Sequence, residues 1–197
     1  MKRFKDLTMT DPFLFHEIMG EPENSKPLLE DLLGKRITKM VSKSGNSLLG
    51  VYVAVTTEDG VCDVSLPMPE MKDIHSRVRA TQAMLDSAAF EPGCSEDDLP
   101  NTCILMICPH DPFGLGRAMC EAGWKVGPLD LDWDDGTRTL FLNWGFTVGN
   151  APKPVSDFLH WLNKECDASV SPYLTQLEKA VQAYKADPFM ERAYNGK

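Results

Sequence analysis

The chain has 197 residues, 43% apolar and 25% charged, and these globular proportions exclude wholesale disorder. Its 20 basic and 29 acidic residues give a net charge of −9, which argues against a protein that grips duplex DNA with its whole surface. The longest apolar run, residues 103–108, is too short for a membrane span of roughly 20 residues, and no apolar stretch follows the basic N-terminus as in a secretory signal. We therefore expect a cytoplasmic protein of one domain over residues 1–197, with 152–197 as a C-terminal helical extension.

The first third of the chain predicts two helices and three strands. Asp11 is placed to cap the first helix and Ser25 to cap a leucine-rich second helix that ends at Gly34. A short strand is predicted over residues 36–41. Two further strands are predicted at 48–57 and 61–66; Asp59-Gly60 between them is a strong hairpin signal.

The remaining chain alternates helices and strands. A helix is predicted over 74–90, and the acidic stretch 91–100 is predicted to be a loop. Segment 102–108, apolar throughout after Thr102, is typical of a strand buried on both faces. A strand at 139–143, a helix at 154–163 and a final helix starting at Ser171-Pro172 complete the pattern. The order predicts an α/β fold with a mixed β-sheet flanked by helices.

Charge is distributed unevenly along the chain. Residues 1–80 carry 11 basic and 12 acidic groups, whereas residues 81–197 carry 9 and 17. We expect the run from Asp130 to Asp135 to be a solvated loop, with contact to a basic partner as the alternative. Trp133 within it is a candidate contact because exposed tryptophan is enriched at binding hot spots. The candidate partner contacts are Asp130, Asp132, Trp133, Asp134 and Asp135.

Basic residues in the first half form a second candidate surface. A local basic face there would bind nucleic acid even though the whole chain is acidic. The candidate residues are Lys35, Arg36, Lys39, Lys72, Arg77 and Arg79. The six cysteines show neither C-x-x-C spacing nor a zinc-finger rhythm, so we expect structural thiols in a reducing compartment.

Several segments resemble one known family. The most specific is the run Ile107-Cys108-Pro109-His110-Asp111-Pro112-Phe113-Gly114-Leu115-Gly116, which is similar to the family pattern I-C-x-x-D-P-F-G-x-G. The opening helix 11–20, the hairpin 50–67 and the tail to residue 194 extend the likeness over nearly the whole chain. The chain thus resembles the recombination-promoting nuclease and transposase family of the PD-(D/E)XK nuclease superfamily, which implies a restriction-endonuclease-like core.

The resemblance also identifies a loss. Family members hold Mg²⁺ with acidic side chains on the hairpin, and the ion activates water and stabilises charge on the scissile phosphate. With the hairpin glycine as register, the family's Asp, Glu and Gln fall on Gly50, Ser65 and Pro67. Asp63 shares a strand face with Ser65, and we expect it to be a surface residue of its strand. We therefore expect no catalytic residues, no metal and no cofactor.

These observations predict a catalytically inactive nuclease-like protein that works by binding. The resemblance points to mobile elements and phage, so the expected partner is a basic nucleic-acid-processing protein or complex, for instance a defence nuclease such as a CRISPR effector that the protein would inhibit. One alternative is a divergent Mg²⁺-dependent DNA endonuclease with relocated ligands. Another is a remnant that binds DNA directly. No membrane partner is expected, and homodimerisation is left open.

Overall fold

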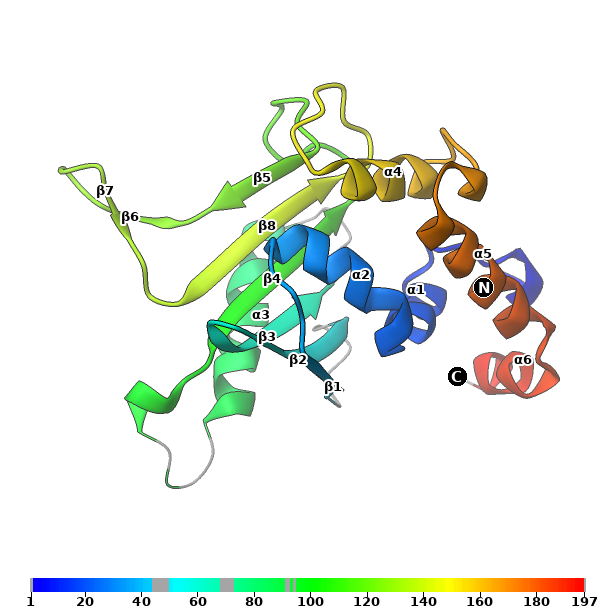
Figure 1. Ribbon diagram of the computed structural model, residues 1–197, viewed down its shortest axis with the longest axis horizontal. Coiled ribbons are helices and arrows are strands. Elements are labelled where there is room, and N and C mark those ends of the chain that lie inside the picture. The colour runs from blue at the N-terminus through cyan, green and yellow to red at the C-terminus, as the bar shows by residue number, and fades with distance from the viewer. Residues whose placement is uncertain (1, 44–49, 68–72, 91–92, 94, 197) are drawn as a thin grey trace.

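The computed structural model describes residues 2–43, 50–67, 73–90, 93 and 95–196. Figure 1 shows a central sheet with helices around it and a narrow hairpin that projects to one side. The helices are α1 (Pro12–Met19), α2 (Pro22–Leu33), α3 (Ile74–Ala89), α4 (Lys153–Leu162), α5 (Pro172–Ala186) and α6 (Pro188–Asn195), with short 3₁₀ turns at Phe4–Asp6, Glu96–Asp98 and Ala168–Val170. The strands are β1 (Lys39–Ser42), β2 (Val51–Thr57), β3 (Gly60–Leu66), β4 (Asn101–Cys108), β5 (Met119–Ala122), β6 (Trp124–Val126), β7 (Leu131–Trp133) and β8 (Thr137–Asn143).

Six of these strands form a mixed sheet in the order β1-β2-β3-β4-β8-β5, and β6 pairs only with β7. The first three strands are antiparallel neighbours, β4 is parallel to both β3 and β8, and β5 is antiparallel to β8. The predicted α/β class with a mixed sheet flanked by helices is confirmed.

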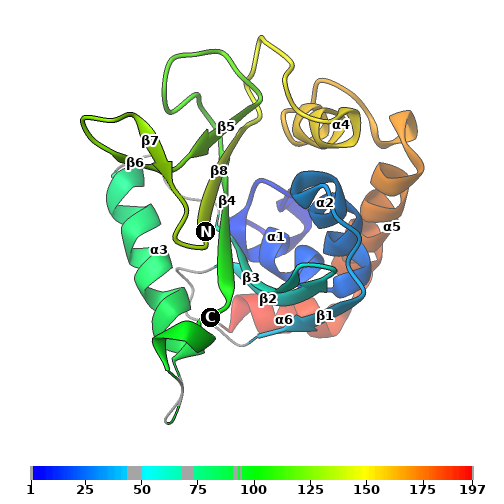
Figure 2. The same ribbon diagram turned by 60° about the vertical axis from the view of Figure 1, so that its left-hand side comes forward.

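The two faces of the sheet have separate cores. Figure 2 shows α3 on one side of the sheet and α1, α2 and α5 on the other. On β4, Leu105 and Ile107 join the core under the larger helical layer, whereas Ile104 and Met106 join the core under α3. Every residue of β4 after Asn101 is therefore buried, which explains why the strand is apolar from Cys103 onward.

The C-terminal helices are part of the larger core. Phe158 of α4 and Leu174 and Leu177 of α5 are fully buried in the same cluster as Leu14 of α1 and Leu29 of α2. Segment 152–197, expected to be an extension, thus packs on the N-terminal helices. In the described part of the chain, no helix combines the length and apolar character that crossing a membrane would need.

The second helix begins earlier than predicted. Ser25 lies inside α2, which starts at Pro22, so the predicted cap at Ser25 is wrong. Pro27 removes the helical hydrogen bond to the carbonyl of Glu23. The amide of Gln176, on α5, donates to that carbonyl at 3.2 Å, and this tertiary contact accommodates the proline within the helix.

Of the other predicted helix and strand boundaries, one is confirmed and others differ. The predicted stop at Gly34 is confirmed, because this residue adopts the left-handed conformation with φ of 65°. Asp11 lies at the N-cap of α1, but its side chain binds Lys2 and Thr8 instead of capping the helix. The first strand runs over 39–42 instead of 36–41, and α6 follows the helix predicted to be the last.

Candidate functional site

The three positions that the resemblance aligns with the family's Asp, Glu and Gln lie together at one end of the β2–β3 hairpin. Gly50 forms an isolated bridge with Leu66, and Ser65 pairs with Tyr52 in the ladder. Ser65 is fully buried. The region that the resemblance aligns with a Mg²⁺ site thus contains a glycine, a buried hydroxyl and a proline.

The backbone at Gly50 leaves no room for a side chain. Its φ is 61°, a left-handed conformation that favours glycine. A Cβ atom at this position would overlap the carbonyl oxygen of Leu66 and lie 2.8 Å from the Cα of Pro67. An aspartate here would therefore require the neighbouring strand to move.

Asp63 is not the surface residue that we predicted, since its side chain is completely buried on the α3 side of the sheet. Lys43 Nζ donates to both carboxylate oxygens, at 2.9 and 2.7 Å, and the Tyr52 hydroxyl donates to Oδ2 at 2.7 Å. The ammonium also lies 5.1 Å from the centre of the tyrosine ring. We call Lys43, Tyr52 and Asp63 the buried triad.

The triad compensates the charge of Asp63, which shares a strand face with Ser65. Burial, followed by the hydrogen bond and the charge of Asp63, raises the pKa of Tyr52 well above its ordinary value of 10. A divalent cation would have to displace an ammonium and a hydroxyl to reach Asp63. In the described residues, no group of three or more His, Cys, Asp or Glu side chains is arranged to hold a metal. The residues present therefore do not fit the Mg²⁺ that the family resemblance implies.

The candidate basic residues are divided between different parts of the fold. Lys35 and Arg36 follow α2, and Lys39 begins β1. Arg77 and Arg79 lie on α3, across the sheet from α2 (Figure 2). Lys35 forms an ion pair with Asp59. Lys72 lies outside the described residues.

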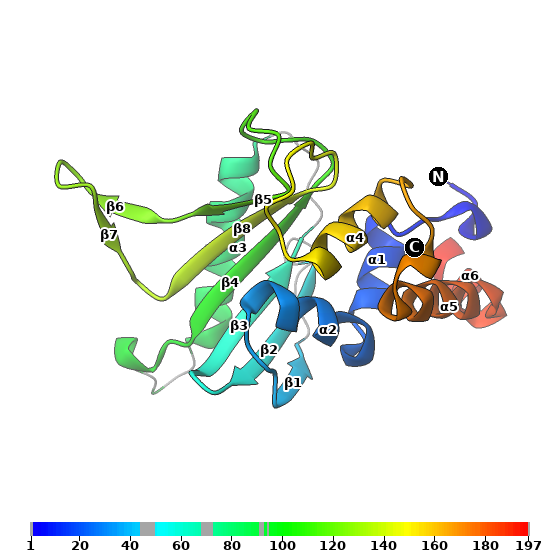
Figure 3. The same cartoon turned by 45° about the horizontal axis from the view of Figure 1, so that its top comes forward.

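The acidic run is partly a strand, so the prediction of a loop is wrong for Leu131–Trp133. This segment is β7, which pairs with β6 to form what we call the outer hairpin, residues 124–133. The outer hairpin continues from β5 and β8 but extends beyond the sheet, as Figures 1 and 3 show. Trp124 is opposite Trp133, and Lys125 is opposite Asp132.

Side-chain contacts fix the acidic residues in their places. Lys125 lies 3.1 Å from both Asp130 and Asp132. Asp134 accepts from the backbone N–H of Gly136 at 3.1 Å, and Asp135 accepts from that of Thr137 at 3.0 Å. Because these turn bonds direct the chain back into β8, the two aspartates have a structural role besides any contact with a partner.

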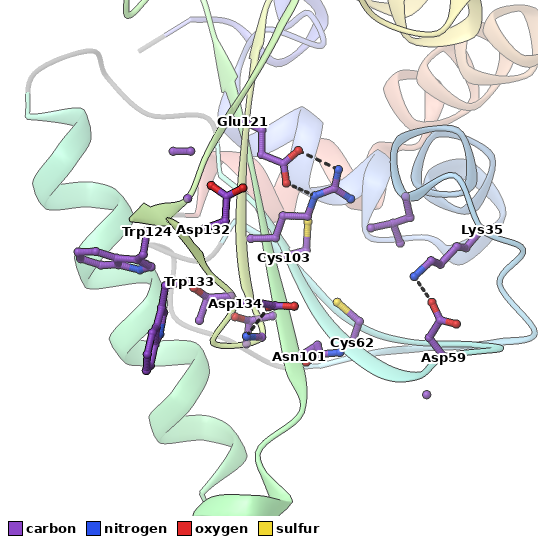
Figure 4. Close-up of a pocket in the computed structure, with 18 of the residues that line it drawn as sticks. Lys35, Asp59, Cys62, Asn101, Cys103, Glu121, Trp124, Asp132, Trp133 and Asp134 are labelled. Carbon is purple, nitrogen blue, oxygen red and sulfur yellow. Dashed lines mark hydrogen bonds and ion pairs between the residues drawn. The ribbon is translucent and has the colours of Figure 1, made fainter. Parts of the chain in front are cut away.

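A cavity of about 650 Å³ lies between the outer hairpin and the nearby ends of β3, β4 and β8. Figure 4 shows Cys62 and Cys103 at its centre, with Lys35 and Asp59 to one side and the two tryptophans to the other. Arg138 contacts Glu121 through two hydrogen bonds, at 2.5 and 3.1 Å. The three basic side chains of the lining, Lys35, Lys125 and Arg138, are all in ion pairs, so the cavity does not suit a phosphate group.

Sequence reasoning gave weight to Trp133 and missed Trp124. The signal was present as an alternation of apolar residues on both sides of Gly127-Pro128, at 124 and 126 and at 131 and 133. Because only four apolar positions alternate and aspartates lie among them, this pattern also fits an acidic loop.

The loop of the most specific family segment is held together by a carboxylate. Asp111 accepts from the backbone N–H groups of Phe113, at 2.9 Å, and Gly116. These backbone hydrogen bonds lower the pKa of Asp111. Phe113 packs edge-on against Phe141 with ring centres 4.9 Å apart. The segment therefore has a structural role in this fold.

Comparison with protein-family models, with curated proteins and with solved structures finds no match to this chain.

Proposed function

We propose that this protein is a catalytically inactive relative of the PD-(D/E)XK nucleases that acts by binding another macromolecule. The motif resemblance supports the nuclease-like ancestry. The mixed sheet, with an antiparallel β1–β3 meander followed by α3 and the parallel strand β4, is compatible with it.

The buried triad carries the proposal of inactivity. A nuclease of this type needs carboxylates that face a divalent cation and the scissile phosphate. Here Asp63 is completely buried and bound by Lys43 and Tyr52, and Gly50 cannot accept a side chain without movement of Leu66. In a nuclease of this type a metal ion stabilises these carboxylates, whereas here the ammonium of Lys43 and the hydroxyl of Tyr52 stabilise the carboxylate of Asp63.

The proposed partner is a basic nucleic-acid-processing protein or complex. The net charge of −9 favours docking on a basic surface over gripping a phosphate backbone. Inhibition of a defence nuclease, such as a CRISPR effector, agrees with this negative charge. It also agrees with the mobile-element or phage setting that the resemblance implies.

Two assays test the proposal. Purified protein incubated with supercoiled plasmid and Mg²⁺ or Mn²⁺ is expected to leave the plasmid intact. Metal-dependent nicking that is lost in Asp63→Asn, and retained in the exposed control Asp97→Asn, would overturn the proposal in favour of the divergent endonuclease.

Binding to a labelled DNA duplex tests the remaining alternative. We expect no binding at physiological salt. Salt-dependent binding that Arg77→Ala/Arg79→Ala abolishes would instead show that α3 contacts DNA directly.

A further inference from the structure

One face of the outer hairpin is apolar and exposed. Residues opposite each other in an antiparallel pair share a face, so Trp124 and Trp133 lie on the same face as Val126 and Leu131. Trp124 is 66% exposed, Trp133 59% and Leu131 59%. Leu129, in the turn, is 72% exposed. Lys125 and Asp132 form the ion pair of the opposite face.

The rest of the described structure does not incorporate this face. Neither core cluster of the described residues contains any of these apolar side chains. Figures 1 and 3 show the outer hairpin beyond the helices, and Figure 4 shows both indoles projecting to one side of it. A two-stranded hairpin is marginally stable by itself, and a contiguous exposed apolar face is a mark of an interaction site.

The charges around this face indicate the chemistry of its partner. Residues 123–136 contain four aspartates and one lysine, a net charge of −3. Asp130, Asp134 and Asp135 lie at the turn and at the base of the hairpin, while the apolar side chains lie between them. An apolar centre with a charged rim is the usual arrangement of a protein–protein interface.

We infer that the outer hairpin docks on a protein surface that presents an apolar depression surrounded by lysine and arginine, with Trp124 and Trp133 as the buried anchors. This inference rests on the proposed function, because it names the surface through which the protein would bind its partner. Aspartates disfavour a nucleic acid on this face, and a second copy of a chain with net charge −9 would bring like charges together.

The probe for this surface is a peptide of alternating lysine and leucine. Two matched peptides, with glutamate for lysine or with serine for leucine, separate the contributions of charge and apolar contact. Nuclear magnetic resonance of the indole N–H groups reports the location, because the chain has four tryptophans. We expect the lysine–leucine peptide to shift the signals of Trp124 and Trp133 and leave those of Trp144 and Trp161 in place.

Substitutions then test the anchors and the rim separately. Trp124→Ser/Trp133→Ser is expected to weaken peptide binding at least about tenfold, as loss of a hot-spot pair does. The control Phe189→Ser removes an apolar side chain that is 64% exposed on α6 and should change nothing. Asp130→Asn/Asp134→Asn/Asp135→Asn keeps the turn acceptors, and we expect it to weaken binding and its salt dependence. The neutralised control Glu23→Gln/Asp97→Asn/Glu191→Gln should not.

Three outcomes would overturn the inference. The first is equally tight binding of the glutamate–leucine peptide, and the second is a set of shifts confined to Trp144 and Trp161. The third is a dimer in sedimentation that Trp124→Ser/Trp133→Ser dissociates, which would make a second copy the occupant. The plasmid assay separates the two proposals. Nicking would defeat the proposed function and leave the peptide result standing, whereas absence of peptide binding with no nicking would defeat this inference alone.

Discussion

The hydroxyl of Tyr52 and the carboxylate of Asp63, on adjacent strands, are 2.7 Å apart, and Asp63 is fully buried. Lys43 supplies the opposite charge from outside the hairpin, at 2.7 Å. A buried carboxylate is tolerated only when charge and hydrogen bonds compensate for its lost hydration. The contact between Tyr52 and Asp63 therefore explains how an acidic residue persists inside the sheet.

Replacing Tyr52 with phenylalanine should destabilise the fold through this one bond. A hydrogen bond to a charged group contributes roughly 1.5–3 kcal/mol, so we expect Tyr52→Phe to lower the free energy of unfolding in urea by about 2 kcal/mol. Tyr173→Phe is the matched control, because its hydroxyl donates to the neutral carbonyl of Asn24 at 2.8 Å. It should cost about 1 kcal/mol. Equal costs for the two variants would contradict a charged acceptor at Tyr52.

Alkaline pH should destabilise the protein through the same tyrosine. Burial, together with Asp63, raises the pKa of Tyr52 in the folded state above the value of 10 that applies to the unfolded chain. The resulting stability is present below pH 10 and is lost as pH rises further, because the unfolded chain ionises while the folded one stays protonated. Urea unfolding between pH 8 and 11 should show this decline.

The variant Tyr52→Phe identifies its share of the decline. It should reduce the slope above pH 10 by up to about 1.4 kcal/mol per pH unit and leave the slope below pH 9 unchanged. Tyr184, whose pKa burial raises to about 12, should account for part of the remaining slope. An unchanged slope in Tyr52→Phe would show that this hydroxyl ionises freely in the folded protein.

The sequence correctly predicted the strands whose local residue pattern is sufficient to identify them. Segment 102–108 is apolar throughout after Thr102, and the structure places a strand buried on both faces there. Asp59-Gly60 predicted the β2–β3 hairpin because a tight turn between two β-rich runs is a local property. These elements depend on neighbours in sequence, so the chain alone is sufficient to find them.

The candidate sites depended on distant partners and were harder to predict. Asp63 alternates with apolar residues as a surface aspartate would, and nothing beside it indicates that Lys43 and Tyr52 neutralise it. Ser25 was predicted to cap the second helix, but α2 starts at Pro22 and continues through Pro27, where the Gln176 amide donates to the carbonyl of Glu23 that the proline leaves without its helical partner. In both cases tertiary contacts outweigh a correct local preference.

Thiol labelling should confirm that three cysteines are structural. Burial raises the pKa of Cys103 and of Cys108 to about 12, and that of Cys62 to about 11. The thiolate is the reactive form, so at pH 8 we expect iodoacetamide to modify these three at least about 100-fold more slowly in the folded protein than in urea. Mass spectrometry of the peptides measures each rate, and fast modification of Cys103 in the folded state would disprove its burial.

Two glycines with similar backbone conformations should respond very differently to alanine. Gly34 has φ of 65° and open space where a Cβ would lie, so Gly34→Ala should cost only the left-handed conformation, about 1 kcal/mol. Gly50 has φ of 61°, but its Cβ would overlap the Leu66 carbonyl oxygen, so Gly50→Ala must also displace β3 beside Ser65. We expect Gly50→Ala to lower the free energy of unfolding by at least about 2 kcal/mol more than Gly34→Ala, since overpacking typically costs 1–3 kcal/mol. Urea unfolding of the two variants makes the comparison, and equal costs would mean that a side chain fits at Gly50, the position that the resemblance aligns with a metal-binding aspartate.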